Sequence, residues 1–192
     1  MEARIIYMND EYVLEGCRNN DRNCQRQLYE KYFRPMSWIC FRYVRNREMA
    51  DDLVHEGFVK VFRNIQNFRD EGSFEGWIKR IMINCCLDHL RKVKRSPDEV
   101  CVETIPETPT GNFDALDELE AEYILEKIDT LPDLPRTVFN LYIIEGYPHK
   151  EIAELMGFKE STSRAYLTEA RQLLRASLKN ITHPSERRFY HG

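Results

Sequence analysis

The stretch ADDLVHEGFVKVFRNI, residues 50–65, decides the fold of the first half of the chain. Its apolar side chains recur at intervals of three and four residues, which predicts an amphipathic α-helix of about four turns. The apolar stripe consists of Ala50, Leu53, Val54, Gly57, Phe58, Val61, Phe62 and Ile65. The opposite face carries Asp51, Asp52, His55, Glu56 and Lys60. Acidic residues near a helix N-terminus interact favourably with the helix dipole, so they need no binding partner to explain them. Taken alone, this face therefore indicates only solvent-exposed surface.

The sequence on either side of this stretch also predicts helices. Residues 9–20 and 21–46 have helical spacing, and Pro35 is expected to bend the second of these helices. Residues 63–73 are polar and predict a loop. Ser73 is a good N-cap for a further helix that is expected to run to about Arg95.

The expected loop at 63–73 and the helix after it combine residue types that suit DNA. The loop contains two asparagines and a phenylalanine, and the polar side of the helix is rich in lysine and arginine. Basic side chains bind phosphates, amides hydrogen-bond to base edges, and aromatic rings stack on exposed bases. This segment is therefore a candidate nucleic-acid interface.

The second half of the chain predicts a helix-turn-helix. After an acidic amphipathic helix at about 114–129, a helix begins at Leu131-Pro132 and ends at Gly146. A short helix at 149–156 is followed by Gly157, which suits a turn with left-handed backbone. The apolar residues expected between the helices are Ile152, Leu155, Leu167, Ala170 and Leu174.

The last helix, from about Glu160, is the one offered to the DNA major groove in this arrangement. It starts with Ser161-Thr162-Ser163-Arg164, and hydroxyl groups near a helix N-terminus bind phosphates well. A three-helix interaction domain without a DNA partner is the alternative interpretation.

Charge is distributed unevenly over the 192 residues, which carry a net charge of −4. Residues 1–95 hold 18 basic and 14 acidic side chains, residues 98–129 hold one lysine and 11 acidic residues, and residues 130–192 hold 9 basic and 7 acidic. Two basic blocks around an acidic segment suggest two nucleic-acid-facing modules and a connector. A solvated linker between two ordinary surfaces gives the same pattern. Helix breakers place the flexible linker at about 96–113.

Composition excludes several classes of protein. With 42% hydrophobic and 31% charged residues, the chain is neither disordered nor collagen-like. No apolar run approaches the roughly 20 residues of a membrane span, and the N-terminus lacks the features of a secretory signal. The six cysteines form no CxxC pair, so we expect free thiols in a reducing cytoplasm, no metal and no cofactor. Catalytic motifs are absent from the sequence, which makes an enzyme a weak hypothesis.

Two sets of motifs resemble the bacterial sigma factors of the sigma-70 family. Residues 51–58 (DDLVHEGF), the turn Gly72-Ser73-Phe74 and residues 77–84 (WIKRIMIN) resemble region 2. Leu131-Pro132 through Gly146, residues 149–157 (HKEIAELMG) and Ala170-Arg171 resemble region 4. A chain with only these two regions resembles the extracytoplasmic-function (ECF) group. Each set of motifs alone is a moderately specific sign of a sigma factor. The region 2 and region 4 sets together, in this order, are a highly specific one.

The resemblance implies an all-α fold of two small helical domains joined by an acidic flexible linker. Region 2 would occupy residues 1–95, the linker 96–113 and region 4 residues 114–182, with a disordered tail at 183–192. Such a protein binds core RNA polymerase and directs promoter recognition, melting of the −10 element and transcription initiation. The implied partners are core polymerase (β′ clamp helices and β flap), promoter DNA and an anti-sigma factor. The implied location is the bacterial cytoplasm, where an anti-sigma factor can hold the chain at the membrane.

The resemblance also assigns residues. Those implied to bind core polymerase are Asp51, Asp52, His55, Glu56 and Val59. Those implied to bind the −10 element are Asn64, Asn67 and Phe68 as candidate readers of an unstacked base, and Lys79, Arg80, Asn84, Arg91 and Lys92. Those implied to bind the −35 element are Lys150, Ser161, Thr162, Arg164, Ala165, Tyr166 and Arg171.

Some positions depart from the family pattern. Glutamine is usual where His55 stands, and Ser163 replaces an apolar residue. Ala165, Tyr166 and Glu169 stand where basic or polar residues are common, so the −35 sequence stays open. Two alternatives remain: an autonomous helix-turn-helix regulator that does not bind polymerase, and a helical adaptor without DNA. The first leaves the acidic face around Glu56 unexplained.

Overall fold

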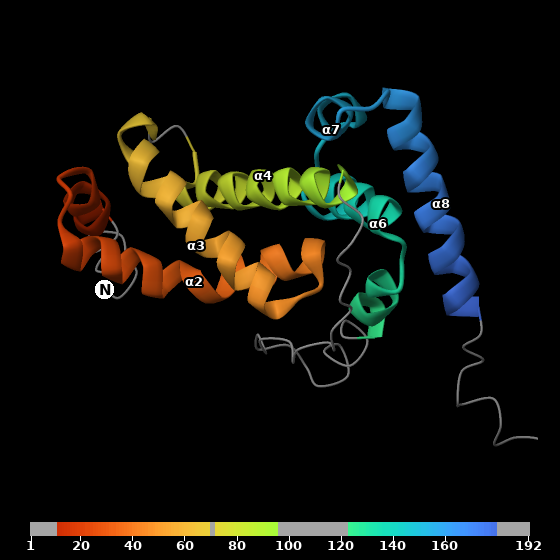
Figure 1. Ribbon diagram of the computed structural model, residues 1–192, viewed down its shortest axis with the longest axis horizontal. Coiled ribbons are helices and arrows are strands. Elements are labelled where there is room, and N and C mark those ends of the chain that lie inside the picture. The colour runs from red at the N-terminus through yellow and green to blue at the C-terminus, as the bar shows by residue number, and fades with distance from the viewer. Residues whose placement is uncertain (1–10, 70–71, 96–122, 180–192) are drawn as a thin grey trace, which may run out of the picture. The chain divides into compact units, whose positions relative to one another are not determined.

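The computed structural model describes residues 11–69, 72–95 and 123–179 (Figure 1). The regular elements in these ranges are helices and include no strand, so the predicted all-α fold is confirmed. The chain divides into two compact units, residues 1–104 and 105–192. The predicted linker and tail, and the first part of the acidic helix expected at 114–129, lie outside the described residues.

The first unit packs three long helices against one another (Figure 1). They are α2, Arg22–Val44; α3, Arg47–Asn64; and α4, Phe74–Arg95. Residues 11–18 form a shorter helix ahead of α2, and the 3₁₀ turn η1, Ile65–Asn67, follows α3 directly. Pro35 lies inside α2 without ending it.

Side-chain caps set where these helices begin, because they satisfy backbone N–H groups that have no partner within the helix. Asp21 Oδ1 accepts hydrogen bonds from the backbone N–H groups of Asn23 and Cys24, at 2.7 and 3.0 Å. Asn46 Oδ1 caps α3 at 2.8 Å from the Met49 nitrogen. Ser73 Oγ accepts from the Gly76 N–H at 3.3 Å, as the sequence predicted.

The apolar stripe of residues 50–65 is the core face of α3, as predicted. All of it is buried except Phe62, which is half-buried. At Gly57 the helix approaches α4 closely, since a Cβ there would lie 2.2 Å from Met82 Sδ. The five cysteines among the described residues are buried free thiols, so they act as small apolar residues.

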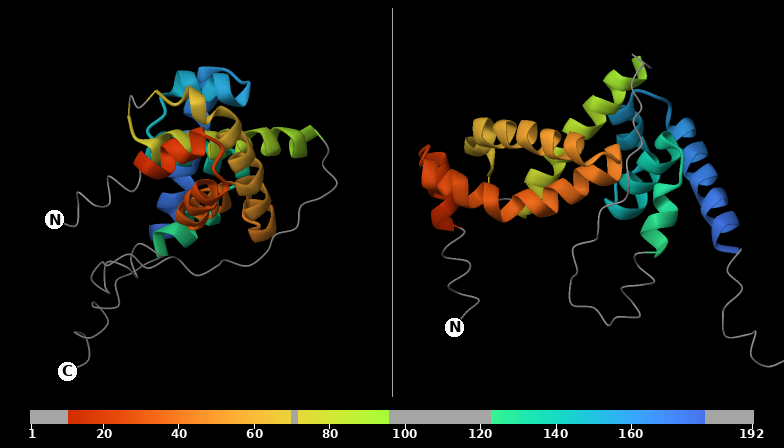
Figure 2. Two further views of the ribbon diagram at one scale, coloured as in Figure 1. Left: turned by 90° about the vertical axis from the view of Figure 1, so that its left-hand side faces the viewer. Right: turned by 60° about the horizontal axis from the view of Figure 1, so that its bottom comes forward.

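In the second unit, the described residues 123–179 begin with a short helix at 123–129, and three α-helices in helix-turn-helix order follow it. They are α6, Asp133–Phe139; α7, His149–Met156; and α8, Glu160–Lys179, drawn in blue in Figure 2. Gly157, at φ +70°, ends α7. Of the apolar residues expected between the helices, Ile152, Leu167 and Ala170 are buried and the other two half-buried.

Two predicted boundaries need correction. The loop expected at 63–73 begins later, because α3 extends to Asn64 and η1 follows it to Asn67. Burial of Ile65 and Phe68 keeps this segment wound against the core. In the second unit, α6 gives way to a π-helical turn, η2 at Asn140–Ile144, before Gly146. Within the described ranges, no helix has both the length and the apolar character of a membrane span.

Candidate functional site

The outer face of α3 presents a mixed acidic and apolar strip. Asp52, His55, Glu56 and Val59 are exposed, and Val59 keeps 48% of its surface accessible. Asp51 differs from them, because it is half-buried and accepts a hydrogen bond from Ser37 Oγ of α2. The strip therefore consists of four of the five residues predicted to bind polymerase, and the fifth is held by the neighbouring helix.

His55 is fixed in orientation by aromatic side chains of α2. Its Nε2 lies 2.8 Å from the hydroxyl oxygen of Tyr29, and the two rings stack with centroids 5.8 Å apart. Phe33 lies at the same centroid distance from the His55 ring. Burial, followed by the negative charge of Asp51, raises the pKa of Tyr29, so its hydroxyl stays protonated.

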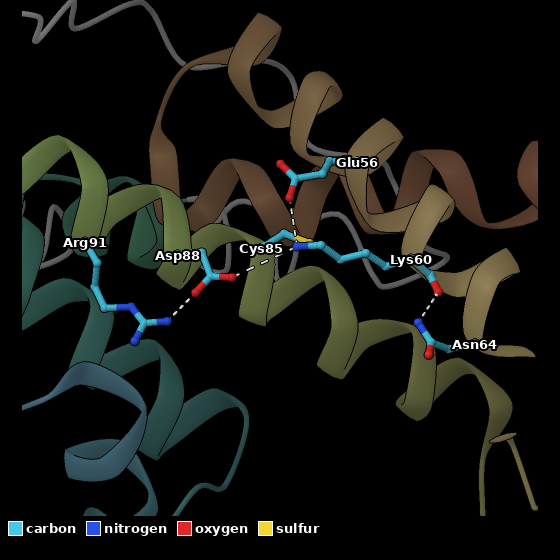
Figure 3. Close-up of polar contacts among 6 residues, drawn as sticks. All are labelled: Glu56, Lys60, Asn64, Cys85, Asp88 and Arg91. Atoms are coloured by element: carbon cyan, nitrogen blue, oxygen red, sulfur yellow. Dashed lines mark hydrogen bonds and ion pairs between the residues drawn. The ribbon is translucent and has the colours of Figure 1, made fainter.

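Lys60 connects α3 to α4 (Figure 3). Its Nζ lies 2.7 Å from Glu56 Oε1, 3.2 Å from Cys85 Sγ and 4.0 Å from Asp88 Oδ2. Asp88 is in turn paired with Arg91 on the same helix. Burial acts to lower the pKa of Lys60, but hydrogen bonds to Glu56 and Cys85 oppose it and the pKa is raised overall. The ammonium group is therefore charged at neutral pH.

The end of α3 and the turn η1 carry three exposed amide residues, Asn64, Gln66 and Asn67. Asn64 Nδ2 donates to the Lys60 carbonyl oxygen at 2.8 Å, and Asn67 Nδ2 lies 3.5 Å from Asn64 Oδ1. Both residues are exposed. Gln66 Nε2 donates to the Arg18 carbonyl at 2.5 Å, and Arg18 donates to the Phe68 carbonyl at 3.0 Å. The helix at residues 11–18 thus braces this segment.

The ring of Phe68, one of the three predicted base readers, is buried among other aromatic rings. It is only 9% exposed, and its ring centroid lies 5.0 Å from that of Phe74 and 5.5 Å from that of Trp77. Its burial closes the core between η1 and α4. In the free chain these aromatic contacts occupy the ring, and the role of Phe68 as a base reader stays a prediction.

The basic residues predicted on α4 do not all share one face. With about 100° of rotation per residue, Arg80, Asn84 and Arg91 fall on the same side as Asp88. Lys79 lies about a quarter turn or more away from them. Arg80, Arg91 and Lys92 are exposed, while Lys79 and Asn84 are half-buried. The structure thus brings together Arg80, Asn84 and Arg91, with Lys92 at the border of the group.

In the second unit, the first turns of α8 carry the predicted DNA-contacting residues. Ser161, Arg164 and Ala165 are exposed along one side, and Thr162 is half-buried. Arg164 is paired with Glu160 at 2.5 Å. Farther from them are Lys150, exposed on α7, Arg171, exposed on α8, and Tyr166, which packs edge-on against Phe158 with centroids 5.8 Å apart.

A buried polar pair joins α7 to α8. His149 Nδ1 lies 2.9 Å from Ser163 Oγ, and the His149 ring stacks on Tyr142 with centroids 4.3 Å apart. Burial, together with the positive charge of Arg164, lowers the pKa of His149 against an opposing effect of Glu160. Ser163 stood out in the sequence as a polar residue at an apolar position, and His149 is the partner that sequence reasoning missed.

Sequence reasoning also missed Lys60 and Asp88. In the sequence they look like ordinary solvated charges, and their contact appears only because α3 packs against α4. Among the described residues, no group of three or more histidines, cysteines or acidic residues could hold a metal ion.

Comparison with known families assigns both units. The model of Sigma-70 region 2 matches residues 28–96, and the model of Sigma-70 region 4 matches residues 121–174. The chain belongs to the sigma-70 family, in its extracytoplasmic-function group. It is therefore an RNA polymerase-binding sigma factor of transcription initiation, and an autonomous helix-turn-helix regulator is not favoured.

Two relatives of this sigma factor match it over nearly their whole length. The ECF RNA polymerase sigma-E factor of Haemophilus influenzae is 28% identical over 188 residues, which cover 91% of this chain and 97% of the relative. The RNA polymerase sigma-H factor of Pseudomonas aeruginosa is 28% identical, with 90% of this chain and 95% of the relative covered.

A solved structure supports the fold. It is the sigma factor RpoE of Bartonella quintana in complex with the anti-sigma factor NepR. The TM-score is 0.52 at 19% sequence identity, and the match covers 80% of this chain and 96% of that chain.

Proposed function

We propose that this sigma factor binds core RNA polymerase through the strip on α3 formed by Asp52, His55, Glu56 and Val59. The observation that carries this proposal is the exposure of Val59 one turn after Glu56 and two turns after Asp52, on a helix whose opposite face is buried. An exposed apolar side chain surrounded by charges suits a partner surface with basic groups around an apolar contact. The β′ clamp helices of core polymerase are the proposed partner.

The same domain reads the −10 element in this proposal. Asn64 and Asn67 are the readers of an unstacked base, because their amides are exposed and can hydrogen-bond to a base edge. Arg80, Asn84, Arg91 and Lys92 hold the DNA backbone next to it, with Lys79 at the margin. Phe68 acts as a support for the segment. Melting is favoured there because a base that leaves the stack is captured.

The second domain reads the −35 element through the start of α8 and rests on the β flap. Ser161, Arg164 and Ala165 share one side of α8, which is the side we assign to the major groove. Thr162 borders this side, and it contacts the DNA backbone together with Lys150, Tyr166 and Arg171, which lie farther away. The protein provides specificity and polymerase performs the chemistry, so we assign it no catalytic activity, and we place it in the bacterial cytoplasm with polymerase.

An anti-sigma factor is the proposed regulator. This rests on the fold shared with the sigma factor that was solved in complex with NepR. A protein that covered the α3 strip and the α8 face together would block polymerase and DNA at once. We propose that release of this partner controls the factor.

The decisive experiment measures binding to core RNA polymerase. The variant Asp52→Ala, Glu56→Ala removes two carboxylates from the strip, and Glu11→Ala, Glu75→Ala removes two exposed carboxylates elsewhere in the same domain. We expect the first variant to bind at least about tenfold more weakly, equal to about 1.4 kcal/mol, and the second to bind like the original chain. A folded chain without affinity for core polymerase contradicts the proposal.

A further inference from the structure

Four charged side chains form a line from the polymerase-binding strip to the DNA-binding side of α4 (Figure 3). Their order is Glu56, Lys60, Asp88 and Arg91, so negative and positive charges alternate. Glu56 belongs to the proposed polymerase strip and Arg91 to the proposed −10 contact. Lys60 and Asp88, in the middle, have no assigned role in either interface.

The links of this line differ in strength. At one end Lys60 Nζ is 2.7 Å from Glu56, and at the other end Asp88 and Arg91 form a close pair. The middle link, from Lys60 Nζ to Asp88 Oδ2, spans 4.0 Å, which is 1.3 Å longer than the contact of Lys60 with Glu56. Lys60 is thus shared unequally, with Glu56 favoured over Asp88.

The position of Lys60 allows its ammonium group to move between the two carboxylates. Cys85 Sγ, 3.2 Å from Nζ, accepts a hydrogen bond and lies on the same helix as Asp88. The Lys60 side chain is 38% exposed and those of Asp88 and Arg91 are 43% and 46% exposed, so water reaches all three. Ion pairs of this exposure are weak and exchange partners at small cost.

We propose that Lys60 is a positioning residue that couples polymerase binding on α3 to DNA binding on α4. A basic group of polymerase that binds Glu56 competes with Lys60 for that carboxylate. The ammonium group then moves to Asp88, where it competes with Arg91. Arg91 is released from Asp88 and becomes available to a DNA phosphate. This inference rests on the proposed function, because it requires both interfaces.

Thermodynamic linkage makes the coupling reciprocal, so DNA bound by Arg91 strengthens polymerase binding by the same factor. The coupling also depends on salt, since partly exposed charges are screened within a Debye length of about 10 Å at 0.1 M ionic strength. Asn64 is independent of the exchange, because it bonds to the backbone carbonyl of Lys60, which a side-chain change leaves in place.

Four variants test the proposal: Lys60→Met, Lys60→Arg, Asp88→Asn and the double variant Lys60→Met, Asp88→Asn. The methionine keeps most of the apolar stem of lysine and removes its charge. The double variant has the same net charge as the original chain, which cancels any general electrostatic effect on DNA. Two affinities are measured for each protein at one salt concentration: that of the chain for core polymerase, and that of the resulting holoenzyme for a promoter DNA fragment.

We expect Lys60→Met to bind core polymerase at least as well as the original chain, because Glu56 has lost its competitor. Its holoenzyme should bind promoter DNA about fivefold more weakly, at the low end of measured coupling between sites, because Asp88 retains Arg91. Adding Asp88→Asn should restore DNA affinity to within twofold of the original. Lys60→Arg, which keeps the charge, should retain most of the DNA affinity.

Three results overturn the proposal. They are unchanged DNA affinity in Lys60→Met, a parallel loss of both affinities as expected from damage to the packing of α3 on α4, and no restoration by Asp88→Asn. The original chain, measured alongside, reports separately on the proposed function. Failure of that chain to bind core polymerase removes both proposals, whereas normal binding with any of the three results removes only the coupling.

Discussion

At the scale of single residues, the His149–Ser163 pair joins the two helices of the helix-turn-helix through a buried hydrogen bond. Both side chains are buried, and the 2.9 Å contact satisfies a nitrogen and an oxygen that would otherwise lack partners. Leaving a buried polar group unsatisfied costs about 1–3 kcal/mol. The orientation of α8, and with it the DNA-contacting side, therefore depends on this hydrogen bond.

The lowered pKa of His149 predicts that acid destabilises the second domain. As pH falls below about 6.5, the unfolded histidine takes up a proton that the folded one resists. The stabilising effect is complete above that pH and is lost as pH falls toward the folded pKa. Urea unfolding at pH 7.5 and 5.5, followed by a probe in the second domain, should show lower stability at pH 5.5.

The His149→Gln variant provides the control, because glutamine can hydrogen-bond to Ser163 and does not titrate near pH 6. It should show less of this loss between the two pH values. The pKa of His89, in the first domain, is also lowered by burial and by Lys92, so a probe confined to the second domain is essential. An equal loss in His149→Gln argues against this role for His149.

At the scale of elements, the packing of α3 on α4 depends on the absence of a side chain at Gly57. A Cβ there would lie 2.2 Å from Met82 Sδ and 2.8 Å from Met82 Cε. Met82 is itself fully buried, so its side chain cannot move without displacing its neighbours. The two helices that carry the proposed polymerase and −10 contacts are therefore held together by a close fit.

Gly57→Ala should destabilise the first domain. The strain of overpacking, about 1–3 kcal/mol, exceeds the gain in helix propensity of about 1 kcal/mol, which leaves a net loss near 1 kcal/mol. Gly76→Ala is the matched control, since a Cβ there meets only the Ser73 side chain, at 3.7 Å or more. It should be neutral or stabilising. Urea midpoints compare the two variants, and a Gly57→Ala protein as stable as the original contradicts the close fit.

The elements also show which features local sequence can predict. The start of α4 at Ser73 and the turn at Gly157 follow from side-chain capping and backbone freedom, which act over a few residues. The burial of Phe68 and the contact of Lys60 with Asp88 depend on how distant segments pack. Hydrophobic spacing shows which face of one helix is exposed, so the strip on α3 could be predicted. It does not show how a neighbouring helix is rotated, so the line of charges from α3 to α4 could not.

At the scale of the whole molecule, charge opposes DNA binding by the free chain. The net charge is −4, and the only strongly charged block is the acidic one at residues 98–129. Two DNA-contacting surfaces that are each modestly basic bind weakly alone. When both surfaces are held on one rigid partner, binding of the first surface raises the effective concentration of the second near its DNA site. Core polymerase is that partner in the proposed function.

The free chain should therefore bind promoter DNA no more tightly than typical non-specific binding, with a dissociation constant of about 1 μM or weaker at physiological salt. The holoenzyme should bind the same fragment far more tightly and distinguish it from a scrambled fragment. Fluorescence anisotropy between about 50 and 200 mM salt tests both, because affinity falls with salt in proportion to the phosphates contacted. Nanomolar, sequence-specific binding by the free chain would instead show that the two surfaces act without polymerase, as in an autonomous regulator.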